Sequence, residues 1–281
     1  MPLILPTRRT LLALAGLLAV VLATTPAITF GRDLSTADLA RARAGKTKAQ
    51  PIGYDISYPQ CGRPFPANPA FGIVGVNRGI VFSANPCLGT GAGASQLAWA
   101  GPHAELYANT GNPGPELSSR WPTGQQTPRV CSAQNPDSAN CAYDYGWNAA
   151  ADSYATAVLA YISLGWAAQG STRTPVANRW WLDVETANSW RGNTALNIAA
   201  LQGAVAYLES VGAASVGFYS APAMWRTITD DTSAFADHPT WVAGASTLKG
   251  AQARCSGDGF TRGGVVLAQY FRNGFDADYR C

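Results

Sequence analysis

The sequence predicts an α/β protein in which strands and helices alternate, built either as a closed (β/α) barrel or as a doubly wound sheet. Short apolar, β-branched runs recur over residues 51–281 and are separated by helical stretches, which favours a parallel sheet with crossover helices. Several runs end in an acidic or aromatic residue, as expected at the rim where barrel enzymes bind substrate. The length of 281 residues suits one barrel as well as two smaller domains.

Residues 1–50 have the pattern of an export signal and a leader. Two arginines precede an apolar run over residues 11–23, and Thr25-Pro26-Ala27 offers a small-residue cleavage site. We therefore expect an export signal over residues 1–30, a flexible leader over residues 31–50, and a secreted or cell-wall-associated, extracytoplasmic protein. The letters TRRTLL also resemble a twin-arginine signal, and the protein would contact a membrane only if the signal stayed uncleaved.

The six cysteines agree with export, because an even count in an exported chain usually means disulfides. Proximity along the chain favours three pairs, Cys61 with Cys87, Cys131 with Cys141, and Cys255 with Cys281. The sequence has no CxxC pair and only two histidines, so we expect no metal site and no cofactor.

The charge balance argues against a nucleic-acid partner. Arg8 and Arg9 leave with the signal, and residues 31–50 carry five basic and two acidic residues, so the net charge of +3 becomes about −2 for the remainder. A nucleic-acid surface would need a basic stripe with interleaved aromatic residues. The sequence also implies no stable protein partner.

Seven runs are expected to be strands, in chain order IGYDIS, FGIVGV, AELYAN, RWWLDV, SVGFYS, TWVAGAS and VVLAQYF. Helices are expected over residues 93–101, 143–166 and 194–211, and residues 111–141 are expected to form a long loop stapled by a disulfide. In a barrel, the strand ends would bring seven side chains to one rim: Asp55, Tyr107, Asp183, Glu185, Tyr219, Trp241 and Gln269.

The fourth run, RWWLDVE, places two carboxylates two residues apart. In a strand, residues i and i+2 point to the same side, so Asp183 and Glu185 share a face while Leu182 and Val184 pack the other way. When two carboxyls are crowded together, one tends to keep its proton near neutral pH, which general acid catalysis of glycoside cleavage needs. Taken alone, the pair is explained equally well by carboxylates that cap the following helix or hold a loop in place.

Four stretches in order resemble glycoside hydrolase family 25, the barrel lysozymes that cut bacterial cell-wall glycan: GYDISYPQ, WWLDVE, GFYSAPAMW with TWVAGAS, and VLAQYFRNGFDADYRC. The resemblance implies a single-domain (β/α) TIM-like barrel over residues 51–281, regular or irregular, with a disulfide-stapled loop insertion. It also implies that Glu185 is the general acid, that Asp183 assists it, and that Asp55 and Asp276 complete the acidic site.

Three places depart from the family pattern. Ala108 and Asn109 follow Tyr107 where a histidine and an aromatic residue are usual, strand two ends in Asn77-Arg78-Gly79, and the loop over residues 111–141 is not the usual layout. Three functions therefore stay open: hydrolysis of β-1,4 bonds in peptidoglycan, hydrolysis of another polysaccharide, and a catalytically silent exported barrel that binds wall glycan or a protein. For substrate binding, the sequence offers the residues Tyr107, Tyr219, Trp241 and Gln269.

Overall fold

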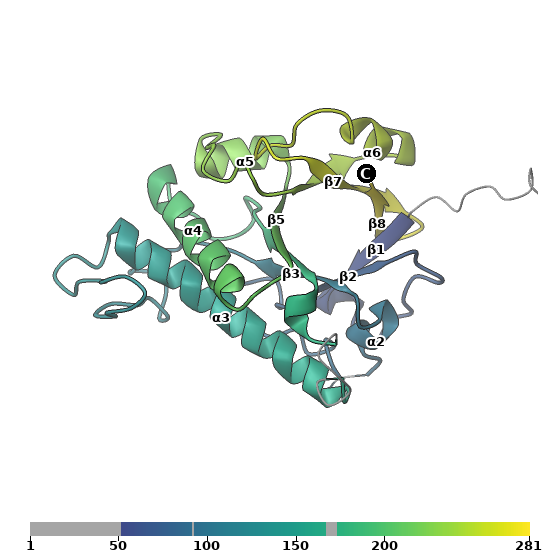
Figure 1. Cartoon of the computed structure of the whole chain (residues 1–281), viewed down its shortest axis with the longest axis horizontal. Coiled ribbons are helices and arrows are strands. Elements are labelled where there is room, and N and C mark those ends of the chain that lie inside the picture. Colours follow the sequence, from purple (N-terminus) through teal and green to yellow (C-terminus); the bar gives the residue numbers. More distant parts are fainter. Residues whose placement is uncertain (1–51, 92, 167–172) are drawn as a thin grey trace, which may run out of the picture. The chain divides into compact units, whose positions relative to one another are not determined.

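The computed structural model describes residues 52–91, 93–166 and 173–281, and these form a closed barrel (Figure 1). The barrel confirms the predicted fold class. The expected export signal and leader lie outside the described residues. In chain order the strands are β1 (Ile52–Ile56), β2 (Gly72–Gly75), β3 (Glu105–Asn109), β4 (Arg179–Asp183), β5 (Ser215–Ser220), β6 (Thr240–Ala245), β7 (Val265–Arg272) and β8 (Phe275–Arg280).

Strand β8 corrects the prediction, which ended the sheet at the run carrying Gln269 and expected parallel neighbours throughout. β1 to β7 pair in parallel, whereas β8 closes the barrel antiparallel to both β7 and β1. Asn273 and Gly274 join β7 to β8 with φ values of 52° and 84°. Asn-Gly is favoured in tight hairpin turns because both central residues need positive φ. The hairpin places Asp276 opposite Asp55.

Helices α3 (Ala139–Ser163) and α4 (Thr194–Ser210) run side by side against the barrel (Figure 1). The predicted aromatic face of α3 packs as core, since Trp147 and Tyr154 both contact Tyr207 of α4, with ring centroids 5.2 and 6.1 Å apart. The helices cross closely at Gly146, where an added Cβ would lie 1.8 Å from the carbonyl oxygen of Ala200. Glycine is therefore required at this crossing.

Shorter helices occupy the other connections: η1 (Tyr58–Gln60), α2 (Gln96–Ala100), η2 (Pro175–Ala177), α5 (Pro222–Thr229) and α6 (Leu248–Arg254). The barrel is irregular, because β1 and β2 are joined by the single turn η1 and a loop. Among the residues that the structure describes, no helix is long and apolar enough to cross a membrane.

Alternate residues of β4 face opposite sides, as the sequence pattern predicts. Trp180 and Leu182 belong to the large core between the barrel and its helices. Trp181 packs inside the barrel with Trp241, and its indole nitrogen donates a 2.6 Å hydrogen bond to the buried carboxylate of Glu105. Asp183 follows Trp181 on the inward face, so the strand delivers this carboxyl to the barrel interior.

The structure contains three disulfides, which join the pairs that proximity favours: Cys61–Cys87, Cys131–Cys141 and Cys255–Cys281. The second ties the loop over residues 110–138 to the first turn of α3. Trp121 of this loop stacks on Tyr145 of α3, with ring centroids 5.0 Å apart, and donates from its indole nitrogen to the carbonyl of Pro136 at 2.7 Å. The predicted loop is thus packed against the helix.

Candidate active site

A cavity of about 280 Å³, called here the acid cavity, lies where β1, β3 and β4 end and β8 begins. Its walls hold the four predicted acids, Asp55, Asp183, Glu185 and Asp276, together with Tyr107. Three of the acids come from different strands, and Glu185 comes from the turn that follows β4. The barrel therefore gathers on one wall carboxyls that are up to 221 residues apart in sequence.

Asp183 and Glu185 form a hydrogen-bonded carboxyl pair. Asp183 is 3% exposed, and burial raises its pKa well above the ordinary range, as do the charge of Glu185 and the hydrogen bond to it. Burial also raises the pKa of Glu185, which is less enclosed, although the hydrogen bond with Asp183 lowers it. These directions favour a proton on Asp183, with Glu185 as the acceptor.

Asp183 is held in place by Asn109, the last residue of β3, and by Thr110, which follows it. Asn109 donates from Nδ2 to Asp183 Oδ2 at 2.6 Å, and Thr110 donates from its hydroxyl to the backbone carbonyl of Asp183 at 2.5 Å. Within the described ranges, Asp183 Oδ1 receives no N–H or hydroxyl donor, which leaves it for the carboxyl pair. Asn109 is itself fixed, because its backbone N–H donates to Asn77 Oδ1 at 2.8 Å.

These contacts explain two of the three departures from the family pattern. Asn77 lies just after β2 and Asn109 ends β3, and together they form the chain of hydrogen bonds that reaches Asp183. Ala108 is 3% exposed and packs in the core toward the helices. Of the altered residues, Asn77 and Asn109 thus support the acid pair.

Asp278 is an acid that the sequence reasoning missed. It lies on β8 two residues after Asp276, is fully buried, and accepts a 2.7 Å hydrogen bond from the indole nitrogen of Trp241. Burial raises its pKa well above the usual range, and the charge of Asp55 and a hydrogen bond to it raise that pKa further. The sequence Asp-Ala-Asp could have revealed it, because in a strand Asp276 and Asp278 point to the same side. That inference requires β8 to be recognised as a strand.

Asp55 lies between the acid cavity and Asp278. Burial and the charge of Asp276 raise the pKa of Asp55 to about 7, while hydrogen bonds from Gln269 and Asp278 lower it. These directions favour Asp278 as the protonated donor and Asp55 as the acceptor. Gln269 Nε2 donates to Asp55 Oδ2 at 3.0 Å, and the Tyr219 hydroxyl donates to Gln269 Oε1 at 2.8 Å.

The four predicted binding residues divide into two groups. Tyr107 lines the acid cavity. Trp241 does not reach the rim as expected, because it is 1% exposed and packs inside the barrel against Tyr219, with ring centroids 4.4 Å apart. Tyr219, Trp241 and Gln269 are not among the residues that line the cavity. They form a layer beneath it that fixes the buried carboxyls.

Among the residues that the structure describes, no group of three or more histidine, cysteine, aspartate or glutamate side chains has the arrangement of a metal site. The fold and the cavity thus define a barrel with a carboxylate-lined site, the arrangement that glycosidases use to protonate a leaving sugar oxygen.

Comparisons with known proteins point to the same class. A family model described as "Lysozyme-like protein 1" matches residues 168–254. A curated relative, the probable GH family 25 lysozyme 4 of Dictyostelium discoideum, is 33% identical over 63 residues, which span 22% of this chain and 29% of the relative. Both matches are to lysozyme or lysozyme-like proteins, so the resemblance seen in the motifs is confirmed. The part aligned with the Dictyostelium protein spans less than a third of that protein's length.

Solved structures of muramidases resemble the chain over a larger part of its length. The muramidase from Acremonium alcalophilum is 15% identical, with a TM-score of 0.49, and the alignment covers 82% of this chain and 93% of that one. The muramidase from Trichobolus zukalii is 18% identical, with a TM-score of 0.45 and the same two coverages.

Proposed function

We propose that the protein is a secreted glycoside hydrolase that cleaves β-1,4 bonds in the peptidoglycan of bacterial cell walls. The observation that carries the proposal is the convergence of Asp55, Asp183, Glu185 and Asp276 on one cavity, with two of them sharing a hydrogen bond. The sequence likeness to lysozymes supports peptidoglycan as the substrate. Residues 1–30 act as the export signal, residues 31–50 as a leader and residues 51–281 as the catalytic barrel.

Glu185 is the general acid in this proposal. It is the more accessible member of the pair, so it can reach a glycosidic oxygen in the acid cavity, whereas Asp183 is buried beneath it. Glu185 protonates the leaving oxygen as the bond from that oxygen to the anomeric carbon breaks. The carbonyl oxygen of the sugar's own N-acetyl group forms the new bond to that carbon, and water activated by the Glu185 carboxylate later opens the ring intermediate.

Asp183 supplies the proton and then holds the substrate. The free pair keeps its proton on Asp183 because burial penalises the charged form there most strongly. When the N–H of the substrate's acetamido group donates to Asp183, the carboxylate form is favoured, and the proton passes along the hydrogen bond to Glu185. In their ionised forms, Asp55 and Asp276 stabilise the positive charge that develops on the sugar ring.

Release of reducing ends from purified peptidoglycan tests the proposal. The full protein, purified after export, is expected to release reducing ends, and mass spectrometry of the products is expected to show N-acetylmuramic acid at the new ends. Binding to the wall material without any release would instead support the silent, glycan-binding barrel. Release from another polysaccharide but not from peptidoglycan would keep the acid mechanism and reject the substrate.

The buried acids predict how stability depends on pH. Because the folded pKa of Asp55 is raised from 3.8 to about 7, the folded state binds the extra proton, and stability falls as the pH rises from about 4 to about 7. The slope is about 1.4 kcal/mol per pH unit for each extra proton. Asp278→Asn keeps a donor for Asp55 and an acceptor for Trp241 while removing one ionisable group, so we expect a shallower fall in urea unfolding free energy.

Asp258→Asn is the matched control for this measurement, because Asp258 is an exposed residue between α6 and β7. Its stability curve is expected to follow that of the parent. A parent protein whose unfolding free energy rises between pH 5 and pH 7 would show that the buried carboxyls do not hold protons, and would contradict the assignment of Asp278 as a donor.

A further inference from the structure

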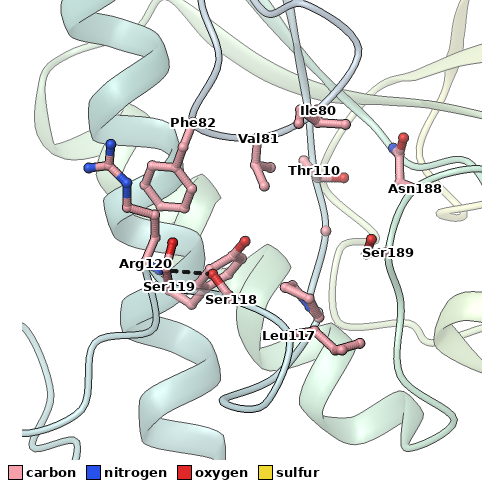
Figure 2. Close-up of a pocket in the computed structure, with 13 residues that line it drawn as sticks. Ile80, Val81, Phe82, Thr110, Leu117, Ser118, Ser119, Arg120, Asn188 and Ser189 are labelled. Carbon is pink, nitrogen blue, oxygen red and sulfur yellow. Dashed lines mark hydrogen bonds between the residues drawn. The ribbon is translucent and has the colours of Figure 1, made fainter.

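A second cavity of about 340 Å³, called here the side cavity, adjoins the acid cavity and has no part in the chemistry proposed above (Figure 2). Asn188 lines both cavities. Gly79 lines the acid cavity and its neighbour Ile80 lines the side cavity. A molecule seated at the acids can therefore extend past Asn188 into the side cavity without leaving the protein surface.

The loop that departs from the family layout builds one wall of the side cavity. Residues 117–120 of this loop face residues 80–82 and Asn188 across the cavity. The stacking of Trp121 on Tyr145 and the disulfide between Cys131 and Cys141 hold the loop against α3. The wall is thus a fixed part of the fold, and the cavity is specific to a chain that carries this loop.

The lining combines exposed apolar groups with one cation. Ile80 and Leu117 are 65% and 80% exposed, so apolar surface at this cavity is open to a ligand. Arg120 is the one charged residue among those lining the side cavity. Its guanidinium lies 5.8 Å from the centroid of the Phe82 ring, and within the described part of the chain it has no carboxylate partner.

The lining residues of the side cavity lie on two opposite sides of it. Figure 2 shows Asn188 and Ser189 on one side of the side cavity and Phe82 and Arg120 on the opposite side. A ligand that enters past Asn188 therefore reaches Phe82 and Arg120 at the far side of the side cavity. This arrangement fits a short chain that bears apolar groups and, away from its attachment, a carboxylate.

We propose that the side cavity binds the peptide that branches from a wall sugar held in the acid cavity, and this inference rests on the proposed hydrolase function. Where the lactyl groups are joined to peptides, the sugar backbone is uncharged and the peptides carry the carboxylates. Arg120 pairs with a peptide carboxylate, and Leu117 covers an apolar side chain nearer the sugar. The loop over residues 110–138 thereby selects peptide-bearing glycan.

Kinetics of the full protein on two forms of one glycan test this inference. The first form is intact peptidoglycan, and the second is the same material stripped of its peptides by an amidase. The parent is expected to have a kcat/KM about fivefold to tenfold higher on the intact form, the range of one charge-assisted hydrogen bond. Arg120→Gln is expected to remove that preference and to leave kcat/KM on stripped strands within about twofold.

Two further variants make the test independent of a folding defect. Leu117→Ser changes a side chain that is 80% exposed, and it is expected to lower kcat/KM about threefold on the intact form alone. Arg129→Gln is the matched control, because Arg129 belongs to the same loop but packs over Tyr143, outside the side cavity. This control is expected to retain the full preference for peptide-bearing glycan.

The outcomes separate the two proposals. Equal kcat/KM of the parent on both forms, or an Arg120→Gln loss of equal size on both, overturns the peptide site while the hydrolase assignment stands. Equal losses would mean that Arg120 contacts the sugar itself, including a lactyl carboxylate freed by the amidase. If the parent releases reducing ends from neither form, the hydrolase assignment fails and the peptide site falls with it.

Discussion

Glu185→Gln is expected to lower kcat/KM for peptidoglycan cleavage about a thousandfold, within the range that a positioned general acid contributes. The leaving sugar oxygen needs a proton, and an amide cannot supply one. Glutamine has the shape of glutamate, and its amide can still form a hydrogen bond with Asp183, so the pair stays connected. The measurement is initial release of reducing ends by parent and variant at equal concentration.

Two controls keep this result interpretable. Circular dichroism and urea unfolding are expected to match the parent, because the substitution changes no packing and removes a carboxyl whose pKa burial raises. Glu209→Gln makes the same chemical change at an exposed position near the end of α4 and is expected to retain full activity. A folded Glu185→Gln protein with more than a tenth of parental activity would transfer the acid role to another carboxyl.

The positions of the acid pair could be read from the sequence because they depend on local geometry. Strand period places Asp183 and Glu185 on one face whatever the rest of the chain does. This prediction does not depend on how the other segments of the chain are assigned. The structure has β4 at Arg179–Asp183. The expected barrel rim already joined Asp55 to these acids, whereas Asp276 required the family resemblance, because its segment was not predicted to be a strand.

How deep a side chain lies within the barrel could not be predicted from the strand period. Trp241 was expected at the rim, but it is the second residue of β6 and lies in the interior. Which layer a residue occupies depends on strand tilt and on the register with both neighbours, and β6 and β7 have shifts in register. Asp278 was missed for a related reason, because its role depends on a strand that the Asn273-Gly274 turn creates.

The side cavity illustrates a different limit. Composition predicted a loop over residues 111–141 and a disulfide within it, but no periodic pattern fixes which loop residues face a neighbouring segment. Arg120 meets Phe82 through contacts between two loops that are far apart in sequence. Contacts of this kind follow from the packing of Trp121 on α3, which only the folded structure reveals.

Asp183→Asn is expected to lower kcat about a hundredfold while KM changes little. In the proposed mechanism, Asp183 provides the proton that Glu185 donates and then accepts the acetamido N–H, and losing one such transition-state interaction typically costs about this much. Asparagine can turn its oxygen toward Asn109 and so keep the 2.6 Å contact. Replacing a buried carboxyl by a neutral amide should leave stability equal or higher, which distinguishes this role from a merely structural one.

The double variant Asp183→Asn with Glu185→Gln provides the decisive comparison. If the two carboxyls act as one proton-carrying unit, as their shared hydrogen bond implies, the double variant should lose little more activity than Glu185→Gln alone. Losses that multiply would mean that the two residues act in separate steps. In that case the proton of the free protein's pair would not be the one transferred, and Glu185 would have to be protonated from solvent.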